Sequence, residues 1–181
     1  MKWAFIDYEN IGCLSKVDLE AYSKVLLFLG AQQPKIDFGD KKYDAPIEFL
    51  VVQVKASQAN NLDFHLSYYL GKYDSETPSE VGFEIISNDN GFAPLIAHVK
   101  QNGRTCKQVK VPLTSAEQNR LVSLLTSRPV DKRPKKVTSL RNHIATQMGI
   151  QGNEVAIQNH VNRLVNAKLI KVSGEDINYN W

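Results

Sequence analysis

Three separated aspartates constrain this chain more than any other feature of its sequence. Asp7 and Asp89 each follow a short apolar run, and Asp63 opens an amphipathic stretch. In an open α/β sheet the carboxyl ends of parallel strands meet at one edge, which is where such folds bind ligands. The sequence therefore predicts an α/β domain that brings the three aspartates to one edge of its sheet.

Apolar runs and breaker residues predict alternating strands and helices over the first 111 residues. Short apolar runs closed by polar residues or glycine are typical of buried strands, and Gly71 and Gly103 are natural helix stops. Strands are expected at residues 2–7, 25–29, 47–54, 83–86 and 107–111, and helices at 15–22, 59–70 and 93–101. This alternation predicts a mainly parallel sheet with helices on both faces.

After Pro112 the pattern changes. A helix expected over residues 115–127 either ends the first domain or begins the second. From Val137 the chain reads helix, turn, helix and hairpin, with helices at 139–148 and 154–167 and strands at 169–172 and 177–181. This order predicts a winged helix-turn-helix module, although a helix pair with a hairpin also occurs in protein-interaction domains.

The net charge of +3 is unevenly distributed along the chain. Residues 1–112 hold 12 Lys and Arg against 14 Asp and Glu, a net −2, whereas residues 113–181 hold 10 against 5, a net +5. Only Asp131 opposes the basic run Arg128, Lys132, Arg133, Lys135, Lys136 and Arg141. Such a run suits a segment that contacts phosphates, and a solvated basic linker has the same composition.

Size and composition exclude several other classes of protein. The 181 residues and 43% hydrophobic content suffice for one domain and a small module. No apolar run approaches the roughly 18 residues needed to cross a bilayer, so we expect a cytoplasmic protein without a membrane partner. Cys13 and Cys106 lack the spacing of a zinc or redox motif, and the four histidines are dispersed.

Clustered carboxylates point to metal chemistry. Without cationic partners they repel one another, and a metal ion relieves that repulsion. Ligands that are all oxygen favour Mg²⁺ or Mn²⁺, which activate water and stabilise charge on a phosphodiester. The structural alternative is that an aspartate at the end of a strand only caps a helix or shapes a turn.

Three segments of the chain, taken in order, resemble the motifs of the NYN branch of the PIN-like ribonucleases. The resemblance covers roughly residues 2–111, and it implies a three-layer α/β/α domain that cuts RNA with one or two divalent ions, Mg²⁺ or Mn²⁺. The segments are Phe5-Ile6-Asp7-Tyr8-Glu9-Asn10, Asn61-Leu62-Asp63-Phe64, and Ile86-Ser87-Asn88-Asp89-Asn90-Gly91-Phe92 followed by Pro94-Leu95-Ile96.

The resemblance also implies roles for individual residues. The three aspartates would be the metal ligands and, together with Asn10, the catalytic set. Asn10 would contact a ligand, a water or the substrate. Ser87 and Asn88 would either shape the turn that presents Asp89 or contact phosphate. Tyr8 would either stack on a base or pack against its own loop.

The sequence departs from the family pattern at one acidic position. Many relatives place a second acidic residue two positions after the one that matches Asp89, and this chain has Gly91 there. Fewer carboxylates would weaken metal binding and leave open a domain that binds RNA without cutting it. Glu9, two residues after Asp7, compensates only if the chain turns directly after Asp7.

We therefore expect a metal-dependent endoribonuclease with a separate module that captures nucleic acid. Residues 1–112 would form the PIN-like (NYN) nuclease domain, 113–136 a helix and basic linker, and 137–181 the winged-helix-like module. RNA is the expected partner, and the winged helix leaves DNA open. The candidate contacts in the second half are Lys132, Arg133, Lys135, Lys136, Gln158, Asn162 and Arg163.

Two other functions remain open from the sequence. In the first, the winged helix is a DNA- or RNA-binding regulator that reads its target with residues 154–167, and the PIN-like domain is catalytically inactive. In the second, the C-terminal module docks a protein or forms a homodimer. Its exposed apolar patch would then include Val155, Val161, Leu164 and Leu169.

Overall fold

The chain folds into two compact units, Met1–Val111 and Pro112–Trp181. The computed structural model describes all residues except 32, 34, 57, 59, 113–118, 120, 121, 124, 127, 150, 153 and 181, and it leaves the side chains of 155, 156 and 166 undescribed. None of the described helices combines the length and apolar character needed to cross a membrane.

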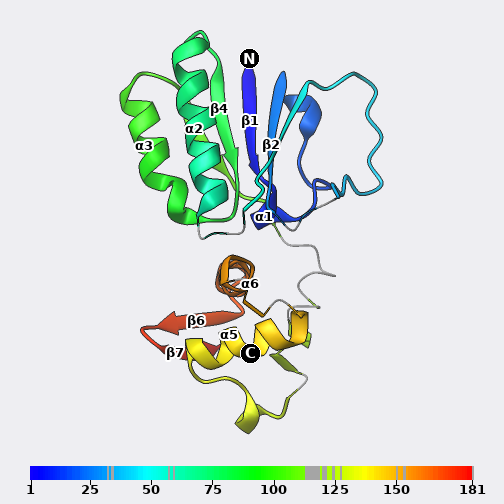
Figure 1. Cartoon of the computed structure of the whole chain (residues 1–181), viewed down its shortest axis with the longest axis vertical. Helices are drawn as coiled ribbons and strands as arrows, with labels where there is room; N and C mark the ends of the chain where they lie inside the picture. The colour runs from blue at the N-terminus through cyan, green and yellow to red at the C-terminus, as the bar shows by residue number, and fades with distance from the viewer. Residues whose placement is uncertain are drawn as a thin grey trace. The chain divides into compact units, whose positions relative to one another are not determined.

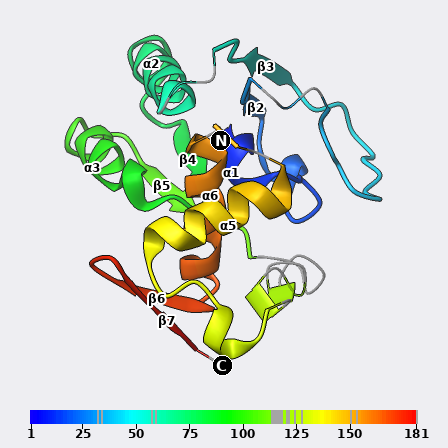
Figure 2. The ribbon, with the colours of Figure 1, turned by 60° about the horizontal axis from the view of Figure 1, so that its bottom comes forward.

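Five parallel strands form the sheet of the first unit, in the order β3-β2-β1-β4-β5. They are β1 (Lys2–Asp7), β2 (Lys24–Leu29), β3 (Phe49–Gln53), β4 (Gly82–Ile86) and β5 (Cys106–Val109). The predicted strands are confirmed to within two residues at each end. Figure 2 shows β3 beside β2 and β5 beside β4. The chain adds β2 and β3 on one side of β1 and then β4 and β5 on its other side, so the direction of strand order reverses between β1 and β4.

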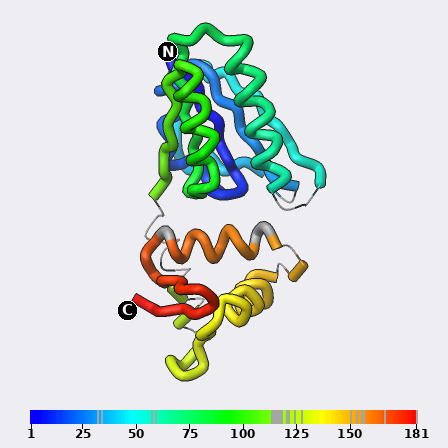
Figure 3. Tube along the Cα trace, turned by 90° about the vertical axis from the view of Figure 1, so that its left-hand side faces the viewer, coloured from blue at the N-terminus to red at the C-terminus, as the bar shows by residue number. Residues whose placement is uncertain are grey.

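Successive side chains of the central strand enter different hydrophobic clusters. Phe5 packs with residues of α2 (Asn61–Glu76) and α3 (Ala93–Gln101), whereas Ala4 and Ile6 join the cluster on the other face. Figure 3 shows the two helices together on one side of the sheet. Both faces of a parallel sheet must be covered, which explains why its strands are apolar on both sides.

The second face of the sheet is covered by short elements and a long connection (Figure 1). The short elements are α1 (Tyr8–Ile11) and the 3-10 helix η1 (Leu19–Ala21), and residues 36–47 complete the cover. The helix expected over residues 15–22 is therefore wrong in extent. Val17 and Leu19 are both buried, and residues two apart do not share a face of an α-helix.

Helix α2 continues past Gly71, where the sequence analysis ended it. The ring of Tyr73 packs against the core of the sheet, which favours the extra turns. At the end of the helix the buried guanidinium of Arg104 donates to the main-chain oxygens of Asp74 and Thr77. These bonds satisfy carbonyl groups that a helix end leaves without partners.

The second unit has the predicted order of elements. A short 3-10 helix, η3 (Val130–Lys132), precedes α5 (Val137–Met148), α6 (Glu154–Asn166) and the antiparallel hairpin of β6 (Ile170–Ser173) and β7 (Asp176–Tyr179). Its core holds Leu125, Leu140, Ile144, Val161, Leu164, Ile170 and Ile177. The helix predicted at 115–127 lies largely on residues outside those described.

The segment before α5 pairs with the hairpin, a feature that the sequence analysis did not predict. Lys136 forms an antiparallel bridge with Asp176. The main-chain N–H of Ile177 donates to the oxygen of Lys135 at 3.0 Å, and that of Val137 donates to the oxygen of Glu175 at 2.9 Å. The unit therefore consists of a segment paired with the hairpin through one β-bridge, then two helices and the hairpin.

Replacing two glycines of the first unit by alanine should have opposite effects on stability. Gly71 and Gly12 both have open space where a Cβ would lie, but only Gly12 has a positive φ, of 71°. We expect Gly71→Ala to raise the free energy of unfolding by about 0.5–1 kcal/mol and Gly12→Ala to lower it by about 1–2 kcal/mol. Urea unfolding measures both, and equal effects would contradict these helix boundaries.

Candidate functional site

The chain turns directly after Asp7, at the end of β1. One carboxylate oxygen, Oδ1, accepts the main-chain N–H of Asn10 at 3.1 Å and caps α1. The other, Oδ2, accepts the hydroxyl of Ser87 at 2.8 Å. Only 4% of Asp7 is exposed. Its carboxylate is thus buried and held in one orientation by residues from two neighbouring strand ends.

A hydrogen-bond network joins the ends of β1 and β4. The main-chain N–H of Asn88 donates to Oδ1 of Asn10 at 2.8 Å, and the N–H of Asp89 donates to the hydroxyl of Ser87 at 3.1 Å. Asn10, Ser87 and Asn88 are all buried. Of the two roles expected for Ser87 and Asn88, this arrangement favours shaping the turn that presents Asp89.

Gln108 on β5 supports the same turn and was missed by the sequence analysis. Its side-chain amide donates to the main-chain oxygens of Ser87 and Asp89, at 2.7 and 2.6 Å. Beyond the strand, Lys110 donates to the side-chain oxygen of Asn90 at 2.8 Å. A glutamine within a predicted strand was the available signal.

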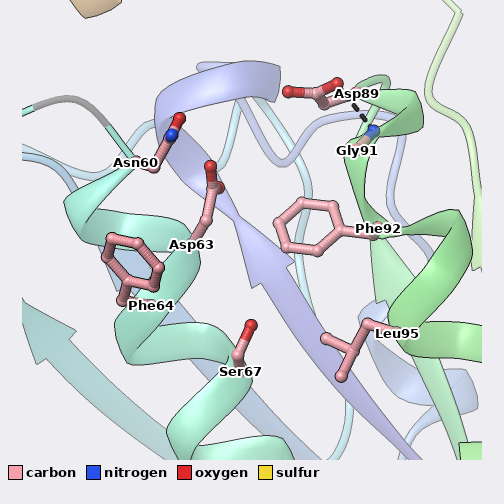
Figure 4. Close-up of a pocket in the computed structure, with 8 residues that line it drawn as sticks. All are labelled: Asn60, Asp63, Phe64, Ser67, Asp89, Gly91, Phe92 and Leu95. Carbon is pink, nitrogen blue, oxygen red and sulfur yellow. Dashed lines mark hydrogen bonds between the residues drawn. The ribbon is translucent and has the colours of Figure 1, made fainter. Parts of the chain in front are cut away.

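Asp63 and Asp89 line one cavity of about 290 Å³. Asp63 lies in the first turn of α2, and Asp89 caps the 3-10 helix η2 (Asn90–Phe92) through the N–H of Gly91. Figure 4 shows Asp63 and Phe92 facing each other from opposite walls. The lining is completed by Asn60, Phe64, Ser67, Gly91 and Leu95.

Glu9 brings a fourth carboxylate to this region. The chain turns directly after Asp7, which is the condition under which Glu9 was expected to compensate for the missing acidic residue at Gly91. A Cβ at Gly30, at the end of β2, would lie only 2.9 Å from the Glu9 carboxyl carbon. Gly30 therefore leaves the space in which the Glu9 carboxylate sits, where its charge interacts with Asp63.

The carboxylates raise one another's affinity for protons. Burial raises the pKa of Asp7 to about 7; the Ser87 hydrogen bond opposes this shift and the charge of Asp63 adds to it. Burial and the charge of Asp63 raise the pKa of Glu9, and burial and the charge of Asp89 raise that of Asp63. In the described part of the chain no lysine, arginine or histidine forms an ion pair with any of the four.

This donor set fits a hard divalent cation. All the available ligands are oxygen atoms, and their mutual repulsion is what a cation would relieve. Among the described residues, no three Asp, Glu, His or Cys side chains converge closely enough to enclose an ion by themselves. Water would complete the coordination, as is usual for Mg²⁺ held by one or two carboxylates.

Tyr8 and Asp37 show how the second face of the sheet supports this edge. The Tyr8 hydroxyl accepts the main-chain N–H of Asp37 at 2.6 Å, and the side chain is 2% exposed. Tyr8 therefore packs against the connection between β2 and β3 and does not present its ring to a base.

The basic residues predicted to contact nucleic acid lie before α5 and beside the hairpin. Lys132, Lys135 and Lys136 are exposed. Lys136 forms an ion pair with Asp176 at 2.7 Å. The guanidinium of Arg133 lies over an aromatic ring of β7, 6.0 Å from its centre. These residues remain accessible to phosphates, although Arg133 and Lys136 already have partners within the unit.

The predicted contacts on α6 form a connected polar group. The side-chain amide of Gln158 donates to Asn162 at 2.9 Å, and Arg141 of α5 donates to Gln158 and Glu154. Arg163 is partly buried on the same helix. This polar group links α6 to α5, and the apolar side chain of Val165 is also exposed on α6.

The apolar patch expected for a docking or dimerising module is largely absent among the described side chains. Val161 and Leu164 are buried, at 3% and 0% exposure, and Leu169 packs against the same core. The side chain of Val155 lies outside the described residues. These side chains stabilise the unit itself, which weakens the docking interpretation.

The stability of the metal-free protein should fall as pH rises from about 4 to about 7. Because the pKa of Asp7 is raised from 3.8, the native state holds more protons than the unfolded state in that window. In chelator at about pH 8, we expect Asp7→Asn to be more stable than wild type by on the order of 2 kcal/mol.

The matched control is Asp40→Asn, which makes the same chemical change at an exposed position. It should leave the pH dependence of unfolding as in wild type. Urea unfolding in chelator at several pH values gives the free energy of unfolding of wild type, Asp7→Asn and Asp40→Asn. A wild-type free energy of unfolding that is constant between about pH 5 and 8 would contradict a buried Asp7 carboxylate without an ion-pair partner among the described residues.

One comparison with known proteins identifies the first unit. A family model described as a PIN domain matches residues 1–109. No curated protein and no solved structure matches the chain. PIN domains are generally nucleases that use divalent metal ions such as Mg²⁺ or Mn²⁺. The match covers more than half of the chain and agrees with the parallel sheet and its acidic edge, so the chain belongs to the PIN domain family.

Proposed function

We propose that this protein is a metal-dependent endoribonuclease that hydrolyses RNA phosphodiester bonds, with a second module that binds nucleic acid. The observation that carries the proposal is the buried carboxylate of Asp7. It is fixed by two hydrogen bonds and shares its surroundings with the carboxylates of Glu9, Asp63 and Asp89, without a cationic partner among the described residues.

Each carboxylate has a distinct part in this proposal. Asp7, Asp63 and Asp89 would hold Mg²⁺ or Mn²⁺ together with coordinated water, and Glu9 would add negative charge from the side of β2. When bound, the ion supplies charge neutralisation and water activation. Asn10 and Ser87 are positioning residues, because their hydrogen bonds keep Asp7 in one orientation. The cavity beside Asp63 and Asp89 is open to a phosphate of the substrate.

The second unit supports a role in capturing the substrate. Its two helices and hairpin, with the preceding segment bridged to the hairpin, are consistent with a winged helix, and residues 113–181 carry a net charge of +5. We propose that Lys132, Lys135 and Lys136 contact phosphates, with Gln158, Asn162 and Arg163 of α6 near the bases. Capture of one part of a strand raises the effective concentration of the rest near the carboxylates.

Cleavage of labelled RNA tests this function. We expect wild type to cut single-stranded RNA with Mn²⁺ or Mg²⁺ and not with chelator. Asp7→Asn should lower the cleavage rate by about 100-fold or more, since it removes a ligand charge that balances the ion. RNA binding should remain within about threefold of wild type, because the substitution alters a metal ligand and leaves the nucleic-acid-binding surfaces of both units in place.

Asp40→Asn serves as the control and should cut at the wild-type rate. Structured RNA and single-stranded DNA tested beside the first substrate define the preferred nucleic acid. Equal cleavage by wild type and Asp7→Asn would contradict the proposed site. Binding without cutting by every protein would favour the alternative, a winged-helix regulator with a catalytically inactive PIN domain.

A further inference from the structure

Two aromatic side chains of α2 are exposed beside the carboxylate cavity. Phe64 is 69% exposed and Tyr68 is 67% exposed. They are four residues apart, so they lie on one face of the helix. In the part of the chain that the structure describes, every other aromatic side chain is buried or half-buried.

The fold of α2 does not require these two rings. Its buried face is formed by Leu62, Leu66 and Leu70, each at 5% exposure or less. Single exposed apolar residues are ordinary, but two large rings together keep considerable apolar surface in water. The exposure of the two rings is therefore better explained by a ligand that binds them than by the folding of α2.

The pair is continuous with the proposed catalytic site. Phe64 lines the cavity together with Asp63 and Asp89 (Figure 4). Tyr68 follows one helical turn later, and its ring makes an edge contact with Tyr69 at 5.4 Å between centres. The aromatic surface thus begins at the carboxylates and continues along α2.

We propose that Phe64 and Tyr68 form a stacking surface for unpaired nucleobases of the strand whose phosphate lies at the carboxylates. This inference rests on the function proposed above and specifies its substrate as single-stranded. Aromatic rings stack on the faces of bases with little sequence preference. A duplex hides those faces within its own stack, so only an unpaired strand can use this surface.

Photocrosslinking of the full chain tests the proposal directly. The probe is a short oligouridylate RNA with 5-iodouracil, which crosslinks to aromatic side chains on irradiation. The adduct is digested to a single nucleotide before mass spectrometry, so cutting of the RNA does not alter the readout. We expect adducts on the peptide that contains Phe64 and Tyr68, and we expect unlabelled single-stranded RNA, but not duplex RNA, to compete.

Variants separate stacking from general apolar contact. Combined Phe64→Leu and Tyr68→Leu keeps apolar surface but removes both rings, and should reduce affinity for single-stranded RNA by about tenfold. Phe64→Trp should retain wild-type affinity. The control Val51→Ala changes an exposed apolar side chain on β3, 46% exposed, and should have no effect.

Failure of the stacking surface and failure of RNA hydrolysis give different experimental results. Adducts confined to residues 112–181, or wild-type affinity in the double leucine variant, would overturn the stacking surface even if the protein cuts RNA normally. Adducts on Phe64 or Tyr68 in a protein that does not cut RNA would support the stacking surface and refute the hydrolysis.

Discussion

The burial of the Asp7 carboxylate is the constraint on which the acidic edge of this protein depends. A carboxylate at 4% exposure needs hydrogen-bond donors, and Asn10 and Ser87 provide them from two different strand ends. The ends of β1 and β4 must therefore be neighbours, and the strand order reverses between these two strands. The same turn that caps α1 directs Glu9 toward Asp63.

A second buried carboxylate in the same sheet shows how this chain compensates such a charge when its role is structural. Burial alone would raise the pKa of Glu84, but hydrogen bonds from Tyr22, Lys107 and Lys2 outweigh it and lower the pKa. Among the described residues Asp7 has no such cationic partners, and its pKa is raised. The contrast supports the proposal that a cation from outside the chain binds at the acidic edge.

Local patterns in the sequence predicted the strands and the acidic edge, because short apolar runs and the residues that end them are adjacent in the chain. Features that depend on distant partners were missed. Helix α2 passes Gly71 because Arg104, some 30 residues later, donates to its last carbonyl groups. Glu9 reaches the site because Gly30 lacks a side chain, and Lys136 pairs with Asp176 across the second unit.

Calorimetric titration with Mn²⁺ tests most directly whether the carboxylates form a cation site. We expect saturable binding by wild type, with proton release near pH 7 because the pKa of Asp7 is about 7. The release is measured by comparing buffers of different ionisation enthalpy. Asp63→Asn should bind Mn²⁺ at least about tenfold more weakly. Equal binding by both proteins, or none by wild type, would contradict the account.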